Sequence, residues 1–152
     1  NKSNNDDVDD VDDDGFVLVS QGRNQRVQKG DPIAHGEMDC IRKAGRQKSY
    51  KQFTIYTSLS PCMMCTGTII QLGIKRVVIG DITNFEGNID LLKKYDIDVV
   101  VLHDDDCIQL MRKFVTEKPS LWAEDIADDD DNDNDNDNGN DDNSNNNSTV
   151  DK

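Results

Sequence analysis

Apolar residues at helical spacing alternate along this chain with short runs that are rich in β-branched residues. Helical spacing covers residues 35–45, 62–72, 89–94 and 105–117, and a final helical turn or two follows Pro119. Strand character covers residues 16–20, 53–58, 76–80 and 98–102. Strands that alternate with helices favour a parallel sheet covered by helices. The pattern therefore predicts a two-layer or three-layer α/β domain in which the later strands are mostly parallel.

Charge is distributed unevenly along the 152 residues, which carry a formal net charge of -14. Residues 1–14 hold seven Asp and one Lys, and residues 128–152 hold ten Asp and one Lys. Low-complexity Asp/Asn segments cannot bury apolar surface and are expected to be disordered. We therefore predict a disordered acidic segment at 1–14, one globular domain at 15–127 and a disordered tail at 128–152. The domain itself is nearly neutral.

Two short motifs place metal-binding side chains at predicted helix starts. His35, Gly36 and Glu37 begin the helix that stops at Gly45, and the run Pro-Cys-Met-Met-Cys at 61–65 begins the helix that stops at Gly73. One imidazole and two thiolates supply three ligands for a tetrahedral zinc ion and leave the fourth position for water. The pattern H-x-E followed by P-C-x-x-C is the signature of zinc deaminases. It predicts one catalytic zinc ion, bound by His35, Cys62 and Cys65.

Glu37 is the candidate catalytic residue of this site. It lies two residues from His35, close enough to exchange protons with a bound water without ligating the metal. Bound zinc lowers the pKa of such a water from about 16 toward about 7.

The cysteine pair has two other interpretations. A structural zinc site would need a fourth ligand, for which Cys40, His103 and Cys107 are the candidates. A redox dithiol would need only Cys62 and Cys65. The upstream H-x-E motif favours the catalytic interpretation over both. Cys40 and Cys107 are then expected to be ordinary buried thiols.

Cysteine usage and hydropathy favour an intracellular protein. The longest apolar run, 99–102, is far too short to span a bilayer, and no signal peptide is recognised. A metal-binding thiol pair suits a reducing compartment. We therefore expect the cytoplasm, with the nucleus as a second compartment, and no membrane partner.

Beyond the metal motif, several segments resemble the fungal cytosine deaminases. These are 27–37 (VQKGDPIAHGE), 55–81 (IYTSLSPCMMCTGTIIQLGIKRVVIGD), Asn84, Phe85, 122–126 (WAEDI) and the stretch 22–24. The resemblance extends over nearly all of residues 15–127. It implies a cytidine-deaminase-like α/β/α sandwich with a mixed sheet. It also implies a zinc-dependent homodimer that hydrolyses free cytosine, a small pyrimidine base, to uracil and ammonia in pyrimidine salvage.

The same resemblance implies roles for five substrate-binding residues. Asn24 and Asp125 would hydrogen-bond the pyrimidine, the backbone N–H of Gly36 would face it, and Phe85 and Trp122 would cover it. Taken alone, three of these residues have simpler interpretations. Asn24 lies in a loop where asparagine usually serves a turn, Trp122 could only fasten the last helix to the core, and Asp125 could be a solvated charge at a helix end.

The resemblance also leaves a gap at the N-terminus. The family has a helix and a first strand ahead of the matched part, and this chain has only residues 1–14 there. A missing strand would expose a sheet edge and an apolar face. We therefore expect the chain as given to be poorly stable and of low activity.

Other functions share the metal motif. A tRNA or nucleic-acid adenosine deaminase would need a basic surface for phosphates, and the neutral domain with acidic ends argues against a nucleic-acid partner. A catalytically silent zinc-binding subunit or a truncated fragment is the alternative from a different class. Deaminases of cytidine or deoxycytidylate are a third option.

Overall fold

The computed structural model describes residues 15–126. In chain order these form α1 (Arg26–Lys29), α2 (Gly36–Ala44), β1 (Thr54–Leu59), α3 (Met63–Leu72), β2 (Arg76–Asp81), α4 (Ile89–Lys94), β3 (Asp98–Val101), α5 (Asp105–Glu117) and α6 (Pro119–Ile126). The predicted elements from α2 onward are confirmed to within a residue or two, and the helical turn or two expected after Pro119 is α6, a helix of eight residues. The segments 1–14 and 128–152, predicted to be disordered, lie outside the described residues.

The three strands form a parallel sheet in the order β1-β2-β3. Val77 of β2 pairs with Ile55 on one side and Val99 on the other. Parallel strands need a crossover between them, and here α3 and α4 supply the two crossovers. Their apolar side chains meet those of the sheet in one core cluster, formed by Ile55, Ile69, Ile74, Val77, Ile79, Leu92 and Ile97.

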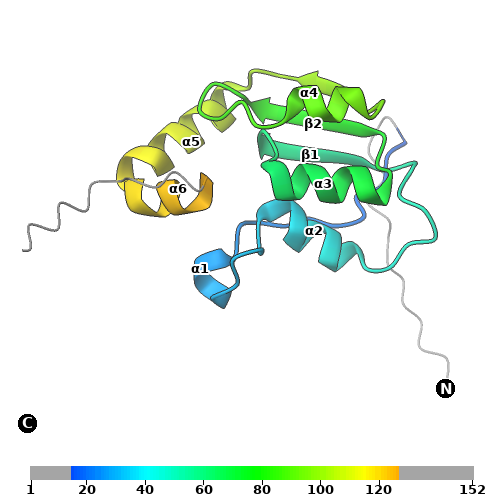
Figure 1. Cartoon of the computed structure of the whole chain (residues 1–152), viewed down its shortest axis with the longest axis horizontal. Coiled ribbons are helices and arrows are strands. Elements are labelled where there is room, and N and C mark those ends of the chain that lie inside the picture. The colour runs from blue at the N-terminus through cyan, green and yellow to red at the C-terminus, as the bar shows by residue number, and fades with distance from the viewer. Residues whose placement is uncertain (1–14, 127–152) are drawn as a thin grey trace, which may run out of the picture.

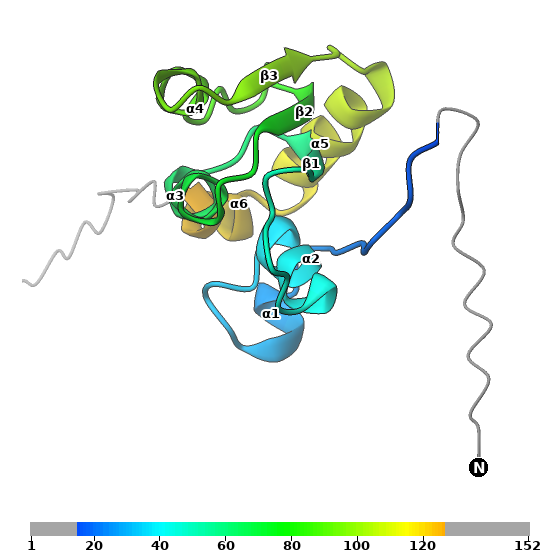
Figure 2. The same cartoon turned by 90° about the vertical axis from the view of Figure 1, so that its right-hand side faces the viewer.

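Helices lie on both sides of this sheet. Figure 2 shows α3 and α4 on one side and α5 on the other, with α2 near β1. Helix α6 follows α5 and packs against it. Figure 1 shows α6 near α1, although these two helices are far apart in the sequence. The α/β architecture is thus confirmed. The sheet was expected to be mixed, and within residues 15–126 it is entirely parallel.

The predicted strand at 16–20 is wrong. Only Val17 forms an isolated bridge, and the apolar side chains of residues 16–19 are exposed. Figure 2 shows this segment, in dark blue, running outside the sheet toward α2. β-branched residues suit a strand only where a neighbouring strand pairs with them. Here the segment leads to Ser20, which contacts Cys40 of α2.

Residues 20–24 are held against α2 by backbone and side-chain contacts. The Ser20 hydroxyl donates to the Cys40 carbonyl at 2.9 Å, and the Arg23 N–H donates to the buried Asp39 carboxylate at 3.3 Å. Lys43 and Lys29 also contact that carboxylate, at 2.8 and 3.1 Å, and their hydrogen bonds lower the pKa of Asp39. These contacts fix the segment that leads directly into the functional site.

Within residues 15–126, no helix is long and apolar enough to cross a membrane.

Gly22 permits the closest approach between this segment and α2. A Cβ atom at Gly22 would lie 2.3 Å from the Cys40 nitrogen and 2.5 Å from the Gly36 carbonyl oxygen. We predict that Gly22→Ala lowers the free energy of unfolding by about 1–3 kcal/mol, because both clashing atoms belong to the backbone. Urea unfolding followed by circular dichroism measures the loss.

Gly67→Ala is the matched control. Gly67 lies inside α3, and a Cβ there would meet nothing within 4 Å. This variant should therefore gain about 0.5–1 kcal/mol from the better helix propensity of alanine. Equal effects of the two substitutions would contradict the close packing at Gly22.

Candidate metal and substrate site

The site lies at the carboxyl edge of the parallel sheet. β1 ends at Leu59, and Ser60 and Pro61 lead from it into α3. β2 ends at Asp81, whose backbone carbonyl accepts from the Ser60 N–H at 3.0 Å. Because parallel strands end at one edge, the loops that follow them come together there, where α/β proteins commonly bind ligands.

Three potential metal ligands meet where α2 and α3 begin. His35 precedes the first residue of α2, Cys62 precedes the first residue of α3, and Cys65 lies in the first turn of α3. Their donor atoms all lie within 4.8 Å of one another, and Nδ1 of His35 is 3.5 Å from Sγ of Cys62. Tetrahedral zinc with ordinary bond lengths separates such donors by roughly 3.5–3.8 Å. The donor set and its spacing fit zinc.

A fourth protein ligand does not join the group. Among the described residues, the metal-ligating cluster contains His35, Cys62 and Cys65 alone. Cys40 instead contacts Ser20, with 3.2 Å between Sγ and Oγ. Cys107 packs closely against Gly80, so that a Cβ atom on Gly80 would lie 2.5 Å from its Sγ. Three protein ligands are typical of catalytic zinc sites, and a structural site would have four. The geometry therefore favours the catalytic interpretation.

The two ligand thiols differ in acidity. A hydrogen bond from Cys65, together with the neighbouring His35, lowers the pKa of Cys62 to about 4. The same hydrogen bond and burial raise the pKa of Cys65. The directions of the two shifts favour the thiolate on Cys62 over one on Cys65. Metal binding would displace the proton of Cys65, since zinc is bound by thiolates.

Glu37 lies in the first turn of α2, two residues after the ligand His35. Burial raises the pKa of its carboxyl group above the usual value. A carboxyl group with a raised pKa can both accept and return a proton near neutral pH. Gly36 is the first residue of α2, so its N–H has no acceptor within the helix and is directed out of it.

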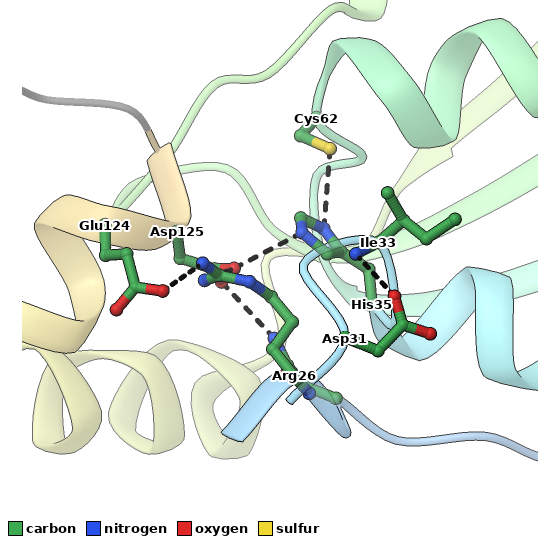
Figure 3. Close-up of polar contacts among 8 residues, drawn as sticks. Arg26, Asp31, Ile33, His35, Cys62, Glu124 and Asp125 are labelled. Atoms are coloured by element: carbon green, nitrogen blue, oxygen red, sulfur yellow. Dashed lines mark hydrogen bonds and ion pairs between the residues drawn. The ribbon is translucent and has the colours of Figure 1, made fainter. Parts of the chain in front are cut away.

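Asp125 brings the C-terminal helix into the site. Its Oδ1 lies 3.3 Å from Nε2 of His35, whose other ring nitrogen faces Cys62 (Figure 3). A carboxylate on the remote nitrogen fixes the orientation of a metal-binding imidazole and makes it more basic. The pKa of His35 is raised, mainly by its hydrogen bond with Cys62 and also by Asp125. Asp125 is therefore more than a solvated charge at a helix end.

Asn24 serves both the turn and the site. Its side-chain carbonyl accepts from the Arg26 N–H at 3.0 Å, which is the turn contact that the residue type alone suggests. Its amide nitrogen lies 3.4 Å from Oδ2 of Asp125. The structure thus brings together two of the residues for which the resemblance implied contacts to a pyrimidine.

Phe85 and Trp122 form an aromatic pair between the loop after β2 and α6. Their ring centroids are 6.1 Å apart and the rings meet at 87°. The Phe85 loop is held by the buried Asp81, which accepts from the Asn84 side chain at 2.6 Å and from the Thr83 N–H at 2.7 Å. All five residues expected to bind substrate lie on the elements that surround the ligand group. Their binding of a substrate remains a prediction.

Arg26 was missed by sequence reasoning. It lies in the single-turn helix α1, which was not predicted, and it contacts the carboxylates of Asp125 and Glu124 (Figure 3). Nothing in the local sequence distinguishes this arginine from a surface residue. Only the contact between positions about 100 residues apart reveals its place.

Comparisons with known proteins agree with the site. The family model for the cytidine and deoxycytidylate deaminase zinc-binding region matches residues 11–81. A cytosine deaminase from Candida albicans is 52% identical over 114 residues, which cover 74% of this chain and 76% of that protein. A tRNA-specific adenosine deaminase from Buchnera aphidicola is 42% identical over 66 residues, which cover 41% of this chain and 44% of that protein.

A solved structure from a study of A-to-I editing by tRNA:A34 deaminases is similar in fold. Its TM-score is 0.52 at 24% identity, over 64% of this chain and 78% of that one. At this identity the similarity supports the fold alone.

The acidities of the ligands predict how zinc affinity depends on pH. His35 and Cys65 both have raised pKa values and must lose a proton to bind. Affinity should therefore fall between about pH 8 and about pH 6, by about tenfold per unit for each proton displaced. Competition with a chromogenic chelator measures it. Cys40→Ser, outside the ligand group, should keep both the affinity and its slope, and an affinity independent of pH would refute the protonation scheme.

Proposed function

The chain belongs to the cytosine deaminase family, and we propose that it hydrolyses free cytosine to uracil and ammonia with one zinc ion per chain. The family is established by the Candida albicans relative, of which the chain covers three quarters at 52% identity. The observation that carries the proposal is the group of three ligands, His35, Cys62 and Cys65, beside the half-buried Glu37, whose carboxyl pKa is raised by desolvation.

The proposed reaction exchanges an amino group for an oxygen. Zinc, when bound, supplies water activated for attack on the ring carbon that carries the amino group. Glu37 would take the proton from this water, pass it to the ring nitrogen N3 and assist the departure of ammonia. The carbon–oxygen bond forms and the carbon–nitrogen bond breaks, so cytosine and water become uracil and ammonia. The raised pKa of Glu37 supports this double role.

Polar and aromatic groups around the ligands would hold the base. We propose that Asn24 and Asp125 pair with the polar edge of the pyrimidine, and that the Gly36 N–H also faces it. Buried groups left unpaired by a wrong substrate would reduce its binding. Phe85 and Trp122 would cover the ring and exclude water. The position of Trp122 on α6, against Phe85 and next to Asp125, supports this arrangement.

Ammonia release from a panel of substrates tests the function. Zinc-loaded protein is incubated separately with cytosine, cytidine, adenosine and a tRNA anticodon hairpin. We expect release from cytosine and none from the other three. Release from the hairpin or from cytidine, with none from cytosine, would replace the proposal with another deaminase activity.

Glu37→Gln is the control for chemistry in the same assay. It keeps the size of the side chain and all three ligands but cannot accept the proton. We expect full zinc content and a loss of turnover of about 10²–10⁴-fold. Wild-type turnover by this variant would exclude Glu37 from the proposed role.

We further propose a homodimer. The support lies in exposed apolar surface near β1, whose second edge pairs with no strand among residues 15–126. Tyr56 of β1 is 68% exposed. Exposed apolar residues beside a sheet edge are typical of an interface.

Sedimentation velocity tests the dimer. At micromolar concentration the protein should sediment as a dimer, and Tyr56→Lys should shift it toward monomer. A monomer at every concentration would contradict the proposal. Tyr95→Lys changes an equally apolar residue, 53% exposed after α4, and should leave the assembly unchanged.

A further inference from the structure

Arg26 is the one arginine that ties the start of the described chain to its end. One guanidinium nitrogen donates to Asp125, and the other lies 2.7 Å from Oε1 of Glu124. The paired residues, carried by α1 and α6, lie 99 and 98 positions apart in the sequence. Figure 3 shows the guanidinium group between the two carboxylates and His35 beyond Asp125.

The guanidinium group is removed from water. Its side chain is 11% exposed, and its Nε is buried with no hydrogen-bond partner in the described part of the chain. A buried charge is unfavourable unless it is paired, and an unpaired buried N–H adds to that cost. By contrast, Arg42 and Asp31 form an ion pair in which the side chains are 43% and 32% exposed. The burial of Arg26 therefore depends on its two carboxylate partners.

Asp125 transmits this contact to the metal ligands. Its carboxylate accepts from Arg26, lies 3.4 Å from the Asn24 amide and lies 3.3 Å from Nε2 of His35. The opposite nitrogen of His35 faces Cys62. Loss of Arg26 would free the carboxylate to turn toward water and would leave the His35 ring without its fixed partner.

We propose that Arg26 is a positioning residue that holds Asp125 against His35 and thereby orients the zinc-binding nitrogen and docks α6 over the site. The predicted effect of Arg26 on zinc affinity depends only on the three ligands, whereas its predicted effect on cytosine turnover rests on the proposed function. A planar guanidinium fork can hold two carboxylates at once, and a lysine ammonium cannot reproduce that geometry. Arg26 acts through Asp125 and does not itself contact the ligands.

The first measurement is zinc affinity, by chelator competition with the full chain. We expect Arg26→Gln to weaken zinc binding by about 10–100-fold, in the range found for groups that orient metal-binding histidines. Arg26→Lys should recover part of the loss. Asp125→Asn should weaken binding to a similar degree, and Arg42→Gln, the matched control, should leave it unchanged.

The double variant Arg26→Gln with Asp125→Asn tests whether one residue acts through the other. If it does, the double variant should bind zinc about as well as Asp125→Asn alone, because coupled residues are not additive. Losses that multiply would overturn the proposal. So would wild-type zinc affinity in Arg26→Gln.

Trp122 reports the docking of α6 independently of zinc. It is the single tryptophan of the chain, so its fluorescence comes from α6 alone. Arg26→Gln should shift its emission to the red and increase quenching by acrylamide. Unchanged emission and quenching would overturn the docking role.

A thermal melt of each variant separates positioning from folding. Should Arg26→Gln fail to fold, Arg26→Lys gives the same test. Glu124→Gln removes only the contact to the 63% exposed Glu124 and leaves Asp125 paired, so it should keep most of the zinc affinity. With cytosine, Arg26→Lys should raise KM more than it lowers kcat. If the Arg26 and Asp125 substitutions are coupled in their effect on zinc affinity but the protein does not turn over cytosine, this inference stands and only the proposed function is rejected.

Discussion

The contact between the beginnings of α2 and α3 is the constraint on which the site depends. Nδ1 of His35 and Sγ of Cys62 are 3.5 Å apart although they belong to helices that approach the sheet from different directions. The position of Cys62 is fixed by β1, since only Ser60 and Pro61 separate it from the strand. The position of His35 is fixed by the packing of residues 20–24 on α2. The parallel pairing of β1 with β2 and the close approach at Gly22 thus together determine the distance between the His35 ring and the Cys62 sulfur.

Much of the fold could be predicted from the sequence because its signals are local. The glycines at 45 and 73 and the proline at 61 mark helix ends. The β-branched run of β2 is buried and that of β3 is half-buried. The ligand group was predictable for the same reason, since His35, Cys62 and Cys65 lie at helix starts that local patterns identify. Each of these features needs only the residues within a few positions of it.

The remainder depends on contacts between distant segments. Residues 16–19 have strand composition, but they form no strand in the structure, and the segment leads to α2. The role of Arg26 is equally nonlocal, because its partners lie at 124 and 125. For Asp125, the local sequence suggested a solvated charge, and only the resemblance indicated a place in the site. In the structure its side chain is 18% exposed and contacts three site residues.

The place of α6 has a consequence for the order in which the protein is assembled. A nascent chain emerges from its N-terminus, and contacts between distant residues form late because long loops must close first. The ligand group is complete once α3 has emerged, whereas Trp122 and Asp125 arrive about 60 residues later. The three ligands are therefore synthesised well before the residues of α6 that lie against them. Because Asp125 contacts His35 and Trp122 contacts Phe85, the orientation of one ligand and the closing of the site both wait for α6.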